Sequence, residues 1–302
     1  MTRLTTATTR SGAIRSIQIG AAMLTLLATS PVAAPAVQEV DLKLVLAVDA
    51  SGSINTEEFT LERQGTADAF SDPDVIKAIQ SGALGRIAVT MFDFSSPEYG
   101  KVVVDWQIIK DKASAEAFAA LIRSTPRSPG RRTSVSNALE LGSLLIESSA
   151  GDIHATRNVI DVAGDGPNND GNPIQEVHDK VIAQGIVVNG LPVMDDNANG
   201  YYPDLDKYYA GCVVGGRGAF VVVVRKYSDF MAAMRHKLIL EVSQNEDQIR
   251  QAMNELQDSG LIKKIAASGA GANAPPQVLR PTNGYADGCD IRGGFGGFGR
   301  FR

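Results

Sequence analysis

The chain has 302 residues, of which 44% are hydrophobic and 21% are charged, and its net charge at pH 7 is −5. This acidic balance argues against non-specific binding of nucleic acid, which depends on lysine and arginine contacts with phosphates. The length is enough for one α/β domain of ~200 residues with additional segments.

Residues 1–36 predict a secretory signal peptide. Three arginines and no acid precede an apolar segment from Ile17 to about Ala34, and the small residues around Ala36 fit a cleavage site. An uncleaved membrane anchor is the alternative, although the segment is short for a membrane span and contains polar residues. We therefore expect an exported protein, periplasmic or secreted, with no membrane span in its mature part.

Strand-like and helix-like segments alternate along residues 37–242. This alternation predicts an α/β domain with a doubly wound, mostly parallel sheet. Strands are expected at Asp41–Val48, Arg86–Phe94, Lys101–Ile109, Asn158–Ala163, Ile186–Leu191 and Ala219–Val224. Helices are expected at Thr56–Phe70, Ser114–Arg123, Ser134–Glu147, Pro173–Gln184 and Tyr227–Val242. The short link between the second and third strands predicts an antiparallel pair, and so one antiparallel strand at the edge of the sheet.

Residues 243–302 form a C-terminal extension of different character. Glu246–Leu256 predicts a short amphipathic helix. Glycine and other small residues dominate from Ala266 onward, which predicts a disordered tail. In an oxidising compartment, Cys212 and Cys289 are expected to form one disulfide, and two free buried thiols are the alternative.

An acid and two hydroxyls follow the first apolar strand, at Asp49, Ser51 and Ser53. Open α/β sheets bind their ligands at the carboxyl ends of their strands. Carboxylate and hydroxyl oxygens suit a hard divalent cation. The alternative is that the hydroxyls cap helices and the acids only end strands.

The pattern D-x-S-x-S after a hydrophobic strand resembles the first loop of the metal-ion-dependent adhesion site (MIDAS) of von Willebrand factor type A (VWA) domains. Gly130–Val135, followed by an Ala-Leu pair, resembles the threonine loop of that site, and Val159–Gly166 resembles its third loop. The resemblance implies a Rossmann-like VWA fold that binds Mg²⁺, with Mn²⁺ or Ca²⁺ as alternatives. The implied ligands are Asp49, Ser51, Ser53, Thr133 and Asp165.

Arg131 and Arg132 depart from the small residues usual in the threonine loop. They could lower cation affinity or form a basic rim that favours an acidic ligand, and simple solvent exposure is a further interpretation.

A second resemblance covers roughly Val40–Val242 and points to an exported bacterial family of unknown function with a VWA-like fold. It rests on Asn189-Gly190-Leu191-Pro192, Tyr208-Tyr209, Val214–Phe220 and Lys237-Leu238.

A second metal loop is a further hypothesis. Asp195, Asn197, Asn199 and Asp206 follow the spacing of an EF-hand calcium loop with aspartate in the last position. The segment before it predicts a strand rather than the helix of a true EF-hand. A polar surface loop is therefore the alternative.

The sequence shows no catalytic constellation. Its histidines, His154, His178 and His236, lie outside the settings that serine hydrolases and zinc proteases require. We therefore predict a module that binds a protein or surface ligand through a divalent cation, with an acidic group of the partner completing the coordination. Two alternatives stay open: a structural or assembly factor of the cell envelope that uses the ion for stability, and a metal-dependent hydrolase. The sequence leaves the partner and the oligomeric state unknown.

Overall fold

A five-stranded sheet with the strand order β4-β3-β2-β6-β7 forms the centre of this computed structural model, which describes residues 1, 37–127, 130–195, 202–243, 246–258 and 289. Four strands are parallel, and the edge strand β4 pairs antiparallel with β3. The strands are β2 (Leu42–Asp49), β3 (Ile87–Phe94), β4 (Gly100–Ile109), β6 (Asn158–Gly164) and β7 (Val187–Pro192). This confirms the predicted fold class.

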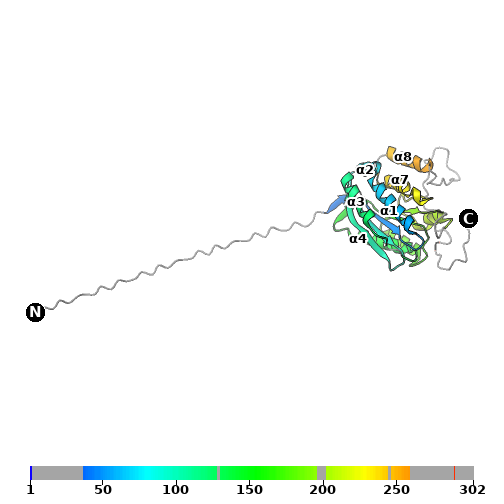
Figure 1. Cartoon of the computed structure of the whole chain (residues 1–302), viewed down its shortest axis with the longest axis horizontal. Helices are drawn as coiled ribbons and strands as arrows, with labels where there is room; N and C mark the ends of the chain where they lie inside the picture. Colours follow the sequence, from blue (N-terminus) through cyan, green and yellow to red (C-terminus); the bar gives the residue numbers. More distant parts are fainter. Residues whose placement is uncertain (2–36, 128–129, 196–201, 244–245, 259–288, 290–302) are drawn as a thin grey trace. The chain divides into compact units, whose positions relative to one another are not determined.

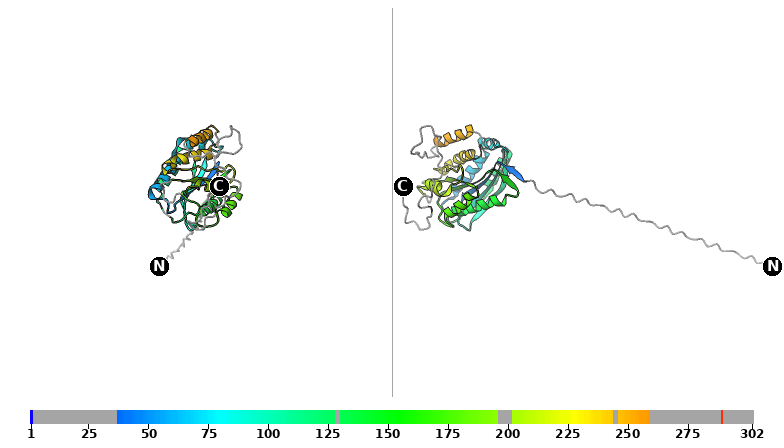
Figure 2. Two further views of the ribbon diagram at one scale, coloured as in Figure 1. Left: turned by 90° about the vertical axis from the view of Figure 1, so that its right-hand side faces the viewer. Right: turned by 180° about the vertical axis from the view of Figure 1, so that it is seen from behind.

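Helices cover both faces of the sheet (Figure 1). One face carries α1 (Thr56–Ser71), α2 (Pro73–Gln80), α3 (Lys112–Ser124) and α7 (Phe230–Val242). The other face carries α4 (Val135–Ser148) and α5 (Ile174–Ala183). The helix α8 (Glu246–Asp258) packs on α7, as all views show (Figures 1 and 2).

The central strand β2 is buried along its whole length because both of its faces are covered. Leu42, Leu44 and Leu46 belong to the core under α1 and α7, whereas Val45 and Ala47 belong to the core under α4 and α5. Successive side chains of a strand point to opposite faces. The continuous apolar run in the sequence therefore reflects a strand between two helical layers.

The first helix begins with a capping box. The Asn55 side chain accepts the backbone N–H groups of Glu57 and Glu58, and the Glu58 carboxylate accepts the N–H of Asn55 in return. These bonds satisfy N–H groups that a helix cannot satisfy internally. The N-cap residue Asn55 is thereby fixed six residues after Asp49, so the loop between them has little freedom.

The prediction of a regular strand at Ala219–Val224 is wrong. The segment runs beside β7, but only through isolated parallel bridges, of Gly190 with Val221 and Val193 with Val224. The backbone N–H of Phe220 donates to the side chain of Asn189 at 3.0 Å. The Asn189 side chain thus accepts the Phe220 N–H group, which in a regular parallel sheet would donate to a backbone carbonyl of β7.

Several short elements were not expected from the sequence. A small parallel pair, β1 (Gln38–Val40) with β5 (Ile153–Ala155), lies outside the main sheet. Three further elements are α6 (Leu205–Tyr208), the π-helical turn η1 (Tyr209–Val213) and the 3₁₀ turn η2 (Tyr227–Asp229). The helix α2 was also missed, although Asp72 caps it and Pro73 occupies its first position.

The disulfide between Cys212 and Cys289 is confirmed, with their Cα atoms 5.6 Å apart. The expected signal peptide and most of the glycine-rich tail lie outside the described residues. Within the described part, no helix is long and apolar enough to cross a membrane.

Candidate metal site

The residues implied as metal ligands come from loops at the carboxyl ends of neighbouring strands. Asp49 ends β2, and Asp165 directly follows β6, which lies beside β2 in the sheet. From β2 the chain continues to β3 on one side, whereas β6 lies on the other. The order of the sheet therefore reverses at this pair of strands. Such switch points leave a crevice in which open α/β sheets bind ligands.

Short contacts join these side chains. The backbone N–H of Ser51 donates to Asp49 Oδ1 at 2.7 Å, and the hydroxyls of Ser51 and Ser53 lie 3.0 Å apart. The Ser53 hydroxyl donates to Asp165 Oδ1 at 2.8 Å. A Cβ on Gly166 would lie 3.4 Å from Thr133 Oγ1, so Thr133 lies against the loop that follows β6. The structure thus brings all five predicted residues to one place.

The threonine loop is held there by backbone bonds. Gly130 N donates to the Ala50 carbonyl at 2.7 Å, which ties this loop to the one after β2. Thr133 and Asn169 exchange two bonds, because Thr133 N donates to Asn169 Oδ1 and Asn169 N donates to the Thr133 carbonyl. Ser95 bonds the same loop from the end of β3. Sequence reasoning missed Ser95 and Asn169, although Ser95 directly follows a predicted strand and Asn169 lies four residues after Asp165.

The two carboxylates are buried with oxygens that lack partners. Asp49 is fully buried and Asp165 is 4% exposed, and Oδ2 of each has no hydrogen-bond partner among the described residues. Burial raises the pKa of Asp49 well above its usual value, and the charge of Asp165 adds to the rise. Burial likewise raises the pKa of Asp165 to about 6, against a hydrogen bond from Ser53. A cation between them would supply the missing partner.

Further ionisable groups lie beneath the site, and sequence reasoning missed them. Glu62 on α1 is buried with neither carboxylate oxygen hydrogen-bonded among the described residues. Asp93 near the end of β3 forms an ion pair with the buried Arg63. Burial raises the pKa of both acids, while the charge of Arg63 opposes each rise. Arg63 therefore stabilises the negative charge of this acidic region.

Two arginines flank the site on its exposed side. Arg131 and Arg132 immediately precede Thr133, and both side chains are exposed. They line a cavity of about 490 Å³ together with Ser96, Glu98 and Asp170. Because the backbone on both sides of the arginines is hydrogen-bonded to Ala50, Ser95 and Asn169, their positions relative to Asp49 are fixed.

The predicted calcium loop is only partly described. Asn197 and Asn199 lie outside the described residues. Asp195 Oδ2 accepts the backbone N–H of Tyr227 at 3.2 Å, and Asp206 is 3% exposed. In the described part of the chain, no cluster of three or more His, Cys, Asp and Glu side chains could hold a metal ion. The site at Asp49 differs from such clusters because three of its five residues offer hydroxyls and only two offer carboxylates.

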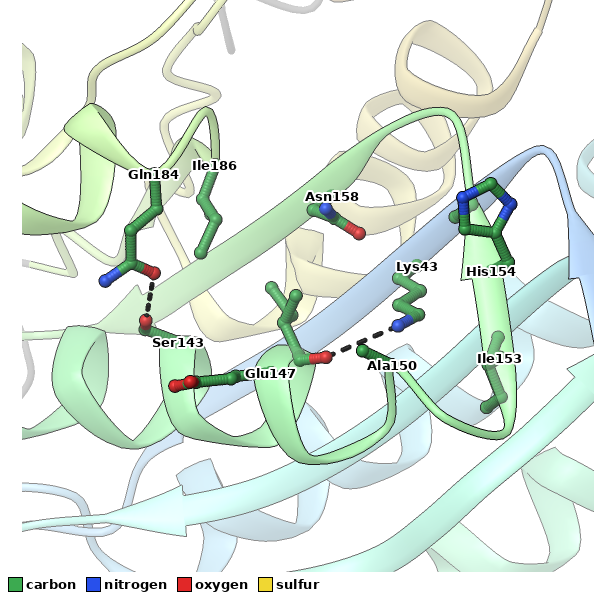
Figure 3. Close-up of a pocket in the computed structure, with 11 residues that line it drawn as sticks. Lys43, Ser143, Glu147, Ala150, Ile153, His154, Asn158, Gln184 and Ile186 are labelled. Carbon is green, nitrogen blue, oxygen red and sulfur yellow. Dashed lines mark hydrogen bonds between the residues drawn. The ribbon is translucent and has the colours of Figure 1, made fainter.

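A second cavity, of about 300 Å³, lies at the amino-terminal ends of the central strands β2 and β6, opposite the ends that carry Asp49 and Asp165 (Figure 3). Its buried lysine, Lys43, donates to the carbonyl of Ile146 at 3.3 Å, and Ser143 donates to Gln184 at 2.6 Å. Lys43 thus bonds a carbonyl in the last turn of α4, where a cation is favourable. The cavity is remote from Asp49 and needs no ligand to explain it.

The family model of DUF1194, described as a protein of unknown function, matches residues 39–246. The chain belongs to the DUF1194 family. No curated protein matches it. Its fold is that of VWA domains, and the similar solved structures include proximal thread matrix protein 1 from the mussel byssus. That structure is 17% identical over 67% of this chain and 48% of its own length, with a TM-score of 0.50.

Two further solved structures are more distant. The von Willebrand factor type A protein from Catenulispora acidiphila is 14% identical, over 67% of this chain and 43% of its own, with a TM-score of 0.46. The pilus adhesin SpaC from Lactobacillus rhamnosus GG is 14% identical, over 72% and 32%, with a TM-score of 0.49. The DUF1194 chain thus spans about half or less of the length of these proteins.

Proposed function

We propose that this DUF1194 protein binds a divalent cation, Mg²⁺ in the first place, and uses it to bind a protein or surface ligand that offers an acidic group. Asp49, Ser51, Ser53, Thr133 and Asp165 would hold the ion. The observation that carries the proposal is the pair of buried Oδ2 atoms of Asp49 and Asp165, which have no hydrogen-bond partner in the described part of the chain and lie beside three hydroxyls. These are hard oxygen donors, which Mg²⁺, Mn²⁺ and Ca²⁺ prefer.

The charge of the site explains why the partner should be acidic. Ser51, Ser53 and Thr133 carry no formal charge, so only two carboxylates would balance the ion. Mg²⁺ usually keeps several waters and is held by one or two carboxylates. A partner carboxylate can replace one such water, and the exposed Arg131 and Arg132 beside the site add attraction for a negative group. This binding is consistent with the proposed export of the chain after residue 36.

A binding experiment with matched variants tests this function. Proteins of an envelope extract are passed over the immobilised chain with Mg²⁺ and then eluted with EDTA. Thr133→Ala should reduce the eluted protein at least tenfold, because the variant lacks one ligand of the ion. Thr125→Ala, which loses a hydroxyl bonded to Ile122 at the end of α3, should elute as much as the wild type.

The chemical nature of the partner is tested in the same experiment. Amidation of the carboxyl groups of the extract proteins should abolish EDTA-sensitive retention. Retention that persists in excess EDTA, with the chain folded by circular dichroism, would falsify a metal-bridged function. It would favour instead an assembly factor that binds through another surface.

The stability of the metal-free protein should depend on pH, and the raised pKa values of Asp49 and Asp165 determine the direction of that dependence. Their raised pKa values mean that the folded state holds protons that the unfolded state has already lost. The metal-free protein should therefore lose stability as the pH rises from about 4 to beyond about 6. Glu62, Asp93 and Glu241, whose pKa values are also raised, act in the same direction.

Bound Mg²⁺ should offset the loss of stability that ionised Asp49 and Asp165 cause, at pH values at which both are charged. We expect saturating Mg²⁺ to raise the melting temperature by several degrees at about pH 7.5 and hardly at all at about pH 5. Differential scanning fluorimetry at both pH values checks this. An equal rise at both would contradict binding through these carboxylates.

A further inference from the structure

A second group of ionisable side chains is buried on the α7 side of the sheet, away from the proposed metal site. Lys237 on α7 is 0% exposed, and its ammonium contacts the carboxylate of Asp161 on β6. Glu241, one turn further along α7, lies with Oε2 3.5 Å from Lys237 Nζ and is 1% exposed. We call Lys237, Asp161 and Glu241 the α7 cluster.

The surroundings of the α7 cluster keep it dry and fixed. The ring of Phe220 lies 5.3 Å from Lys237 Nζ. The Asn189 side chain on β7 donates to Glu241, and its oxygen accepts the N–H of Phe220. Arg157 donates to the backbone carbonyl of Glu241 at 2.9 Å. Strands β6 and β7 and the helix α7 therefore hold the side chains of the α7 cluster against one another.

The α7 cluster holds two carboxyl groups for one ammonium. Burial and the neighbouring charge of Asp161 raise the pKa of Glu241 to about 8, so Glu241 carries a proton at neutral pH. The Asp161 carboxylate contacts the Lys237 ammonium, and a hydrogen bond with Asp161 also contributes to the raised pKa of Glu241. A charged pair in this environment is costly.

We propose that Lys237 and Asp161 are joined by an intramolecular amide bond, formed within the folded chain with Glu241 as the proton shuttle. In this step the Lys237 ammonium passes a proton to the Asp161 carboxylate, and the resulting amine attacks Cγ of Asp161, forming the Nζ–Cγ bond. The Glu241 carboxyl gives its proton to the departing hydroxyl and takes one from Nζ. The Cγ–OH bond breaks, one water leaves, and Glu241 ends as it began.

No oxidant, metal or cofactor is needed for this step. A fixed amine beside a carboxyl carbon reacts with the advantage of an intramolecular reaction, and burial disfavours the return of water. The bond would tie α7 to β6, the strand that leads to Asp165. It would act as a permanent cross-link in a part of the chain that the disulfide does not reach.

Peptide mapping of the purified full-length chain tests the proposal. After reduction and trypsin digestion, residues 158–180 and 236–250 should appear as one linked species, lighter by one water than the two peptides together. Trypsin should also fail to cut after Lys237, because its amine is blocked. Recovery of the unlinked peptides, with cleavage after Lys237, would overturn the proposal.

Two other dehydrations change the mass equally and must be told apart. Succinimide formation at Asp165-Gly166 would leave residues 158–180 as a separate peptide. An amide between Lys237 and Glu241 would place the lost water inside residues 236–250. Either result counts against the Lys237–Asp161 bond.

Variants separate the roles within the α7 cluster. Lys237→Met should abolish the linked species, whereas Lys43→Met, which removes the buried lysine of β2, should leave it unchanged. Glu241→Gln keeps the shape of the side chain but cannot shuttle a proton, and the linked fraction should fall from nearly complete to below a tenth. Full linkage in Glu241→Gln would refute the role of Glu241. If a variant does not fold, the wild-type digest decides alone.

Discussion

Replacing Asp49 with asparagine is expected to abolish the stabilisation by Mg²⁺ and, at the same time, to make the metal-free protein more stable. The carboxylate is fully buried and its Oδ2 has no partner among the described residues. Ionisation of this group is therefore unfavourable in the folded chain, which the raised pKa of Asp49 expresses. The neutral amide removes that penalty, which we put at about 1–3 kcal/mol at neutral pH.

Thermal melts with and without Mg²⁺ measure both effects of Asp49→Asn. Asp41→Asn is the matched control, because Asp41 lies just before the other end of β2 and accepts the N–H of Leu84 at 2.9 Å. The control should keep the full response to Mg²⁺ and lose a little stability. An Asp49→Asn protein that still responds to Mg²⁺ like the wild type would exclude Asp49 as a ligand.

Arg63→Met is expected to cost about 3–5 kcal/mol of unfolding free energy, because it leaves buried acids without their cation. Arg63 is 5% exposed and pairs with Asp93, which is fully buried. Its guanidinium also lies 4.7 Å from the centre of the Phe59 ring and 3.4 Å from the Met91 sulfur. Methionine can fill much of this space but cannot balance the charge.

Urea denaturation of two variant pairs checks this cost. Arg123→Met removes a more exposed arginine, paired with Asp68, and should cost less than about 1 kcal/mol. Adding Asp93→Asn to Arg63→Met should restore part of the loss, because one buried charge then disappears. A cost for Arg63→Met no larger than that for Arg123→Met would show that the buried acids do not need this arginine.

The sequence alone was sufficient for the α/β fold and for the place of the candidate site. The apolar run of β2 is long and uninterrupted because the strand is covered on both faces, and such runs are visible without a structure. The resemblance of three loops to the VWA adhesion site pointed to Asp49, Ser51, Ser53, Thr133 and Asp165. Each lies within a few residues of a strand end or a helix start, and the carboxyl ends of parallel strands meet at one edge.

Only the tertiary structure showed which groups support that site and which lie elsewhere. Arg63 and Asp93 are 30 residues apart, and Asp161 and Lys237 are farther apart still, so no local pattern pairs them. The irregular segment at Ala219–Val224 depends in the same way on the Asn189 side chain from another strand. Local patterns report which residues are buried and where elements end. The partner of a buried charge is set by packing between distant segments, and low-dielectric surroundings make that partner decisive for stability.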